Sequence, residues 1–272
     1  MGGDSTHGAV KTLIAGLWLC CALWAGGQSA VVTGEQASTG GGGGGDFTTG
    51  LIFDLDPESL SASDGDGIET VSDTSGNAHH FSNATSGSRP IFTNSTSGLN
   101  GKKTLWFDGS ADHLTNRTYT VAAQNYTYFG VVRFNVAYHN FANGYLLDDT
   151  LTTLSIRPHD ANVHKLTIYD ASAAREFAAI SDTQPRLISV VMNSTGTALR
   201  VYTNGVSMGS ATAWQQPSAG GYLVFGSLAN GQTAYFNGTA ARQRLYSGAL
   251  SDANRQTVED YLGAIYGLTI TH

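Results

Sequence analysis

The acidic residues of this sequence are the first candidates for chemistry, because two carboxylates that face one bond can act as general acid and base. On a strand such a pair occupies alternate positions, since alternate side chains share a face. The glutamates do not meet this requirement: the two that lie closest in sequence, Glu58 and Glu69, are eleven residues apart. Asp54 and Asp56 do alternate in the segment FDLDP, where a role in a turn or in binding an ion is the competing interpretation. Hydrolysis by paired carboxylates is therefore disfavoured.

Nucleophilic and transition-metal sites are disfavoured as well. The segment GVSMG matches Gly-x-Ser-x-Gly around Ser207, but that motif needs a strand, a strained turn and then a helix, and here the serine follows a hairpin turn. The adjacent His79 and His80 would point to opposite faces of a strand. His159 and His164 have no cysteine available to complete a closed zinc site. Ordinary surface histidines are the simpler interpretation.

A sugar-binding surface needs an exposed aromatic ring for the pyranose face, together with amide or carboxylate groups for the hydroxyls. Trp106 lies among strand residues in TLWFDG, so we expect it in the core, whereas Trp214 lies in the loop-like segment ATAWQQPSAGG. The segment AYHNFANGY has a similar mixture of side chains. An ordinary loop is the competing interpretation for both segments. The candidate sugar-binding residues are Trp214, Gln215, His139, Asn140, Asn143 and Tyr145.

Short strands separated by turns must position these candidates. The segment ALRVYTNGVSMG alternates on both sides of Asn204-Gly205, which predicts a hairpin with a type I′ turn. Further runs rich in β-branched and aromatic residues, each bounded by turn residues, are TLWFDG, YTYFGVVRF, KLTIYD, RLISVVM, GYLVFGS and ARQRLY. Many short strands at this spacing predict an all-β sandwich.

One helix is predicted, in the segment LSDANRQTVEDYLGAIYGL from 250 to 268, with Ser251 as its N-cap and Gly267 as its stop. Its apolar stripe comprises Val258, Tyr261, Leu262 and Ile265. The residues that we expect to point away from the covered surface are Arg255, Glu259 and Asp260. The helix is therefore expected to pack on a sheet and to carry no chemistry.

An apolar block near the start of the chain predicts export. Residues 13–25 (LIAGLWLCCALWA) follow Lys11 and precede small residues, which predicts a signal peptide over 1–30 with cleavage between Gly27 and Ala30. The block is shorter than the roughly 20 apolar residues of a membrane span. An uncleaved anchor is the alternative.

The rest of the chain is expected to hold one domain. A Gly-rich flexible linker is predicted over 31–46, and a single β domain over 47–272. The only cysteines, Cys20 and Cys21, lie in the predicted signal peptide, so the mature chain is expected to contain no disulfide. We also expect no membrane insertion after cleavage.

The charge of the chain limits its partners, and its sequons indicate a secreted glycoprotein. The formal net charge is -7, with 13% charged residues, so we expect neither nucleic acid nor an anionic membrane surface as the partner. The asparagines that match the glycosylation sequon are Asn83, Asn94, Asn116, Asn125, Asn193 and Asn237.

The order of several motifs resembles the laminin-G-like, or concanavalin A-like lectin and glucanase, superfamily, most closely its bacterial-type jelly-roll branch. The motifs span Gly50 to Leu268 and are LIFDLDPESL, VSDTSGNAHHF, RPIF, GLNGKKTLWFDGSADHL, YTNGV and LYSGALSDANRQTVEDYLGAIYGL. The resemblance implies a two-sheet antiparallel jelly-roll sandwich with a short C-terminal helix that covers it. One position departs from the family: Arg242, in GTAARQRLY, stands where an acidic residue is common, which puts the role of that carboxylate in doubt.

The resemblance also implies that the opening strand lies beside the closing strands, which would bring Asp54 near Asp73. Carboxylates, the side chain of Asn77 and backbone carbonyls of a Gly-containing turn are the hard oxygen ligands that calcium requires. We therefore predict a structural Ca²⁺ held by Asp54, Asp73 and Asn77. Hydrogen bonding of Asp73 within its own turn is the alternative, and a nearby Arg242 would favour it because a cation competes with the ion.

The resemblance, more than the composition, indicates a function. It implies a secreted, extracellular, non-catalytic lectin-like module that binds carbohydrate or glycoprotein surfaces, with no cofactor besides the predicted calcium. Two alternatives stay open. The first is a structural or adhesion protein that uses the sandwich for protein contacts, and the second is a polysaccharide-active hydrolase or lyase with a site that these motifs do not reveal.

Overall fold

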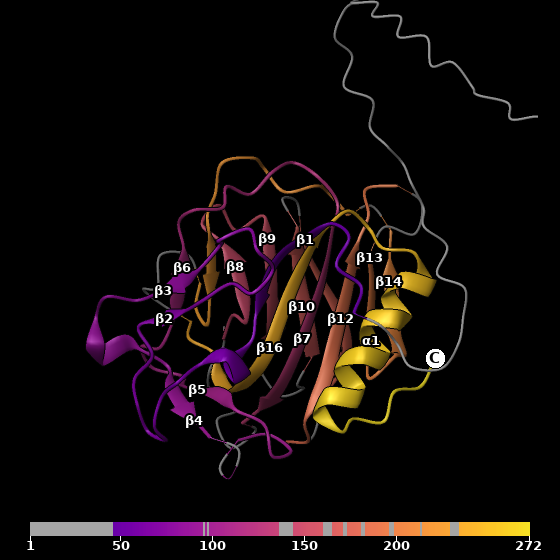
Figure 1. Cartoon of the computed structure of the whole chain (residues 1–272). Coiled ribbons are helices and arrows are strands. Elements are labelled where there is room, and N and C mark those ends of the chain that lie inside the picture. The colour runs from indigo at the N-terminus through magenta and orange to yellow at the C-terminus, as the bar shows by residue number, and fades with distance from the viewer. Residues whose placement is uncertain are drawn as a thin grey trace, which may run out of the picture. The chain divides into compact units, whose positions relative to one another are not determined.

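The computed structural model describes residues 46–94, 96, 98–135, 144–159, 165–170, 173–180, 183–195, 199–212, 214–228 and 234–272. Within these residues two antiparallel sheets of eight strands each form a sandwich, with one α-helix near the C-terminal end (Figure 1). This is the predicted two-sheet jelly-roll sandwich with a C-terminal helix. No helix in the described part of the chain is long and apolar enough to cross a membrane.

The strand order defines two sheets, here named sheet A and sheet B. Sheet A has the order β14-β13-β12-β7-β16-β5-β4, and β1 pairs with β16 beside this path. Its strands are β1 (Leu51–Leu55), β4 (Ile91–Thr93), β5 (Thr104–Asp108), β7 (Tyr126–Phe134), β12 (Arg186–Met192), β13 (Leu199–Thr203), β14 (Val206–Ala211) and β16 (Asn237–Ser247). Sheet B has the order β11-β10-β9-β8-β15-β6-β3-β2. Its strands are β2 (Thr70–Val71), β3 (Phe81–Ser82), β6 (Leu114–Asn116), β8 (Leu147–Asp149), β9 (Leu154–His159), β10 (Lys165–Asp170), β11 (Ala174–Ala179) and β15 (Leu223–Phe225). The helical elements are the 3-10 helices η1 (Pro57–Ser59) and η2 (Ser86–Ser88) and the α-helix α1 (Asp252–Tyr266).

Strand β7 shows how sheet A is covered on both faces. Tyr128 and Val132 belong to the core between the two sheets, whereas Phe129 and Val131 belong to a second apolar cluster that includes residues of α1. Alternate side chains of a strand point to opposite faces, so one apolar run fills both clusters. The face of sheet A that is turned away from sheet B is called the outer face below.

The hairpin and the helix ends agree with the sequence predictions. Asn204 and Gly205 between β13 and β14 have φ of 49° and 82°, the two positive values that a type I′ turn requires. Ser251 caps α1 by accepting a hydrogen bond from the Asn254 N–H at 3.3 Å. Gly267 ends the helix in the left-handed conformation with φ 62°.

The predicted orientation of two charged helix residues is wrong. Arg255 and Glu259 are buried and form an i,i+4 ion pair, and the Arg255 guanidinium lies 3.7 Å from the centroid of the Tyr202 ring. The chain after the helix returns over its side, where the Thr271 N–H donates to the Asn204 carbonyl at 2.9 Å. Helix α1 is therefore covered by the hairpin and the terminal segment as well as by the sheet, which the stripe pattern alone could not show.

Candidate functional site

Three side chains from neighbouring strands form a row on the outer face of sheet A. In the strand register Trp106 on β5 is opposite Thr239 on β16, and Thr239 is opposite Arg133 on β7. Side chains directly opposite each other on antiparallel strands have Cβ atoms about 5 Å apart. An indole ring, a hydroxyl and a guanidinium therefore follow one another across the sheet.

Alternation along the strands turns this row outward. Leu105 and Phe107 on either side of Trp106 belong to the core between the sheets, as do Val132 and Phe134 on either side of Arg133. Trp106 and Arg133 must therefore point to the opposite face. Trp106 is 39% exposed, which is unusual for so large an apolar side chain in the middle of a strand.

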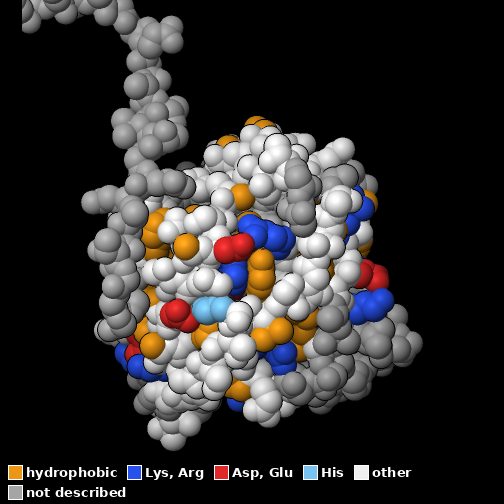
Figure 2. All heavy atoms as spheres, turned by 90° about the vertical axis from the view of Figure 1, so that its right-hand side faces the viewer, with side chains coloured by type: hydrophobic (Ala, Val, Ile, Leu, Met, Phe, Trp, Pro, Cys, Tyr) orange, Lys and Arg blue, Asp and Glu red, His pale blue; other side chains and the backbone are white. Residues whose placement is uncertain are grey.

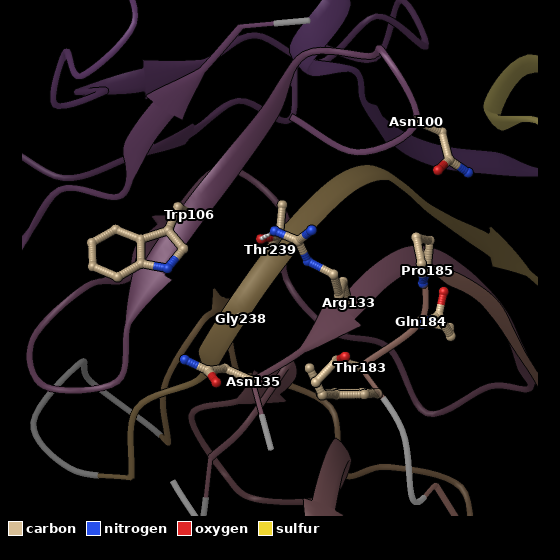
Figure 3. Close-up of a pocket in the computed structure, with 10 residues that line it drawn as sticks. Asn100, Trp106, Arg133, Asn135, Thr183, Gln184, Pro185, Gly238 and Thr239 are labelled. Atoms are coloured by element: carbon tan, nitrogen blue, oxygen red, sulfur yellow. Dashed lines mark hydrogen bonds between the residues drawn. The ribbon is translucent and has the colours of Figure 1, made fainter. Parts of the chain in front are cut away.

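The row lies in a pocket with a volume of about 550 Å³ (Figure 3). Its other described lining residues come from the loop before β5, the end of β7, the segment before β12, and β16. They are Asn100, Phe134, Asn135, Thr183, Gln184, Pro185 and Gly238. The pocket thus combines one accessible aromatic face with amides, hydroxyls and one cation.

Helix α1 explains why the pocket lies at this end of the sheet. The helix covers Phe129 and Val131 on β7, but Arg133, the next residue on the same face, lines the pocket instead. The Asn100 side-chain amide donates a hydrogen bond to the Tyr266 carbonyl, in the last turn of α1, at 2.7 Å. The closing helix therefore leaves this part of the outer face accessible and holds one residue of the pocket wall.

The structure reverses the sequence-based assignment of the two tryptophans. Trp214 is 2% exposed and belongs to the core between the sheets. The exposed position predicted for Trp214 is wrong, and a ring packed in the core has no face with which to stack on a sugar. Trp106, which we expected in the core, has the accessible face. Alternation of Leu105, Trp106 and Phe107 could have placed Trp106 on the opposite face of the strand from its two neighbours, but not shown that this face is accessible.

Of the other predicted sugar-binding residues, the two that the structure describes, Gln215 and Tyr145, do not line this pocket. Gln215 is exposed, and its backbone N–H donates to Asp170 Oδ2 at 3.2 Å. Tyr145 is buried, which raises its pKa, and its hydroxyl accepts a hydrogen bond from Arg157 Nη1 at 3.0 Å. The prediction of Tyr145 as an exposed ring is therefore wrong. The candidates that lie outside the described residues, and so stay predictions, are His139, Asn140 and Asn143.

The acidic residues proposed for calcium do meet, but through hydrogen bonds. The Asp54 N–H donates to Asp73 Oδ1 at 2.8 Å, and Asp73 also accepts the N–H groups of Ser75 at 2.9 Å and His79 at 3.0 Å. Desolvation by burial would raise the pKa of Asp73, but these donors outweigh it and hold the pKa below its ordinary value. Asn77 donates its side-chain N–H to the Leu51 carbonyl at 2.8 Å. This is the local turn bonding that was the alternative to a calcium site.

Arg242 pairs with Asp54. Arg242 Nε donates to Asp54 Oδ1 at 2.7 Å, and Arg244 Nη2 donates to Asp54 Oδ2 at 2.8 Å. Strand β16 carries a register shift between Ala240 and Gln243, beside which these arginines meet β1. No group of three or more His, Cys, Asp or Glu side chains in the described ranges is placed to hold a metal. Calcium here stays a prediction, and the ion pairs favour a structural role for Asp54.

Neither Asp112, whose pKa is perturbed, nor Ser207 is among the described residues that line this pocket. Burial, together with the charge of Asp108, raises the pKa of Asp112 to about 6. Asp112 Oδ2 accepts the Asp108 N–H at 3.0 Å, and Asp108 Oδ1 accepts the Ser110 N–H at 2.8 Å. These carboxylates close the turn between β5 and β6 and do not line the pocket. Ser207 lies within β14, where an elbow motif would require a helix.

Two of the predicted glycosylation sites are wrong for the folded chain. Asn116 is fully buried, and the Asn83 side-chain amide is buried while it donates to the carbonyls of Ser88 at 2.7 Å and His113 at 3.0 Å. A glycan on Nδ2 requires that atom in solvent, which burial prevents. The partly exposed sequons, which stay predictions, are Asn94, Asn125, Asn193 and Asn237.

Comparison with known proteins shows similarity in structure rather than in sequence. No protein-family model matches this chain, and no curated protein matches its sequence. Domain 4 of AbnA, a GH43 extracellular arabinanase from Geobacillus stearothermophilus solved in complex with arabinotriose, is similar in fold with a TM-score of 0.52. The sequences are 16% identical, and the match covers 72% of this chain and 98% of that domain.

Two larger proteins contain a similar structure. Trypanosoma rangeli sialidase in complex with sialic acid gives a TM-score of 0.56 at 16% identity over 81% of this chain, which spans only 34% of the sialidase chain. The binding domain of botulinum neurotoxin serotype D/C gives a TM-score of 0.50 at 13% identity, and the match covers 79% of this chain and 53% of the neurotoxin chain. Such low identities show the fold alone. The fold is a jelly-roll sandwich.

Proposed function

We propose that this chain is a secreted, non-catalytic carbohydrate-binding protein that binds glycans in the pocket around Trp106. The observation that carries the proposal is an exposed tryptophan in the middle of a strand, in register with polar side chains and inside a pocket of sugar size. Pyranose rings stack their C–H faces on aromatic rings, and amides and hydroxyls satisfy their hydroxyl groups. Trp106 supplies the aromatic ring, and Asn100, Asn135 and Gln184 supply amides.

The comparisons support this proposal at the level of fold. Domain 4 of the arabinanase, which this chain covers almost completely, was solved with a bound arabinotriose. We infer membership of the laminin-G-like and concanavalin A-like superfamily from the sandwich and from the order of the motifs. Secretion belongs to the same proposal, and N-terminal sequencing of exported protein tests it, because Met1 still present on that protein would contradict signal cleavage.

Truncation of Trp106 tests the binding site. Trp106→Ala should weaken glycan binding at least about tenfold, because loss of ring stacking and apolar contact is expected to cost about 1.5 kcal/mol. Leu151→Ala is the matched control, since Leu151 is also a large exposed apolar residue, 47% exposed, and does not line the pocket. Both variants should melt within a few degrees of the parent protein, as expected for surface substitutions.

The assay is a glycan array followed by isothermal calorimetry on each glycan that binds. Equal loss of affinity in Trp106→Ala and Leu151→Ala would show that the pocket is not the glycan-binding site. Binding that persists unchanged in both variants would place the site elsewhere on the sandwich. Absence of binding to every glycan on the array would contradict the proposed function itself.

A structural or adhesion protein acting through protein contacts is the second candidate. Such a role favours a contiguous apolar surface of several hundred Å². The exposed large hydrophobic residues of the described chain lie on separate elements: Trp106 on β5, Leu151 after β8 and Val206 on β14. On the side that bears α1, hydrophobic side chains are scattered among polar ones (Figure 2). These surfaces favour the carbohydrate proposal.

A further inference from the structure

The charge of the pocket indicates which glycans it selects. We propose that the pocket binds sugars that carry a carboxylate, such as uronic or sialic acids, and that Arg133 binds that carboxylate. This inference rests on the proposed carbohydrate-binding function and names the ligand class for the same site.

The first observation is the composition of the pocket wall. Of the ten described residues that line it, Arg133 is charged and the other nine are uncharged. The chain as a whole has a formal net charge of -7, so a cationic pocket does not follow from average composition. An isolated positive charge in a partly enclosed site attracts an anion more strongly than the same charge on an open surface, because solvent screens it less.

The second observation concerns the contacts of Arg133, compared with those of the other arginines that the structure describes. Several of them form ion pairs with carboxylates of the chain: Arg89 with Glu69, Arg175 with Asp170, Arg200 with Asp252, Arg242 with Asp54, Arg244 with Asp46 and Arg255 with Glu259. In the described part of the chain the polar contact of the Arg133 guanidinium is the hydroxyl of Thr239, with Nη2 3.3 Å from Oγ1. The remaining N–H donors of its fork therefore stay available for a ligand.

The third observation is the position of Arg133 relative to the aromatic ring. Arg133 and Trp106 flank Thr239 in one row, and their strands lie two strand spacings apart, on the order of 10 Å. Figure 3 shows the Arg133 side chain extending over β16 toward Trp106. A sugar ring stacked on Trp106 can thus place its own carboxylate, or that of the next ring, beside the guanidinium.

The geometry of the guanidinium favours a carboxylate. Its planar fork donates two parallel N–H bonds that match the two oxygens of a carboxylate, and such charge-assisted bonds are stronger than bonds between neutral groups. The Thr239 contact restrains one arm of the fork in advance, which lowers the ordering cost of binding. Sulfate esters share the negative charge but not the planarity, so they form a separate arm of the test.

The test compares acidic sugars with neutral counterparts on the full chain. The probes are trigalacturonic acid and its methyl ester, a sialylated trisaccharide and its asialo form, and a sulfated disaccharide. Each acid should bind roughly tenfold more tightly than its neutral counterpart, the gain expected for a charge-assisted hydrogen bond. High salt should reduce this preference because ions screen the contact.

Two arginine variants assign the preference to a position. Arg133→Gln should abolish the preference for acids while binding to the neutral sugar persists. Arg117→Gln is the matched control, because it makes the same change of charge at an exposed arginine that packs on the Tyr222 ring and does not line the pocket. Arg117→Gln should keep the parent preference, and Trp106→Ala should weaken the acid and its neutral counterpart alike.

The outcomes separate this inference from the function on which it rests. Trp106-dependent binding with equal affinity for acids and neutral sugars would overturn the inference and leave the proposed function in place. Tighter binding of the sulfated probe than of either carboxylate would overturn the choice of a carboxylate. Binding of none of the probes would overturn the inference, whereas absence of binding to every glycan on the array, or binding that does not depend on Trp106, would overturn both.

Discussion

Replacing Trp214 with alanine should destabilise the sandwich strongly. The side chain is 2% exposed in the core between the sheets, and a buried tryptophan removes roughly 200 Å² from water. At about 25 cal/mol per Å² this corresponds to about 5 kcal/mol, and large-to-small core substitutions of aromatic residues cost about 3 to 5 kcal/mol. Because the indole Nε1 is buried and has no hydrogen-bond partner among the described residues, the indole also carries a desolvation penalty that its removal relieves. We therefore expect a loss of about 3 to 4 kcal/mol.

This loss is large enough to measure by thermal unfolding. For a domain of this size 1 kcal/mol shifts the melting temperature by about 2 to 4 °C, so Trp214→Ala should melt about 6 to 16 °C below the parent chain. Circular dichroism near 218 nm follows the sheets directly. Trp214→Phe is the informative second variant, since it keeps an aromatic ring and lacks the unpaired N–H, and it should recover more than half of the lost stability.

The comparison with Trp106 decides whether the two tryptophans have been assigned correctly. Trp106→Ala should move the melting temperature by no more than about 3 °C, because its ring is 39% exposed at the outer face. A Trp214→Ala variant that melts with the parent chain but loses glycan binding would refute the assignment. So would a Trp106→Ala variant that unfolds earlier than Trp214→Ala.

Two further predictions concern buried carboxylates. Asp54→Asn should destabilise the domain by about 1 to 3 kcal/mol, because it removes the carboxylate that two buried guanidinium groups share, while Arg244 keeps Asp46 and Arg242 keeps Asp56 as a charged partner. In urea unfolding, a midpoint as little changed as that of the exposed-pair control Glu69→Gln would contradict this. Burial, then the charge of Asp108, raises the pKa of Asp112 to about 6 in the folded chain. The folded chain therefore holds this proton more tightly than the unfolded chain, and its stability falls as the pH rises from about 4 to about 6. The free energy of unfolding of Asp112→Asn should therefore rise by about 1 to 3 kcal/mol relative to the parent chain between pH 4 and 6, with no further rise above pH 6. A difference between the two chains that does not change with pH would contradict the raised pKa.

Much of the secondary structure was predictable because its signals are local. The Asn204-Gly205 turn depends on two residues that tolerate positive φ, and the ends of α1 depend on Ser251 and Gly267. The strand that contains Trp106 was found from its apolar and aromatic content, which reflects preferences within a few positions. Each of these features is set by short-range geometry, so the sequence alone was sufficient.

The candidate site was harder to predict because it depends on which surfaces meet. Alternation could place Trp106 on the other face of its strand from Leu105 and Phe107. It could not show which face is accessible, because both faces of β7 in the same sheet are covered. The loop-like context of Trp214 suggested exposure, yet the segment packs its ring into the core. Arg133 carried no signal in sequence, since its importance comes from the residues beside it on other strands.

The sequence by itself determined an all-β sandwich with a closing helix, because hydrophobic period and turn chemistry act over a few residues. Tertiary structure alone decided that β5, β16 and β7 are neighbours, that α1 stops short of Arg133, and that Trp106, Thr239 and Arg133 form one row. It also decided that Arg242 and Asp54, on different strands, form an ion pair. Residues more than a hundred positions apart create these features, and their proximity follows from the pairing of strands, which no local pattern specifies.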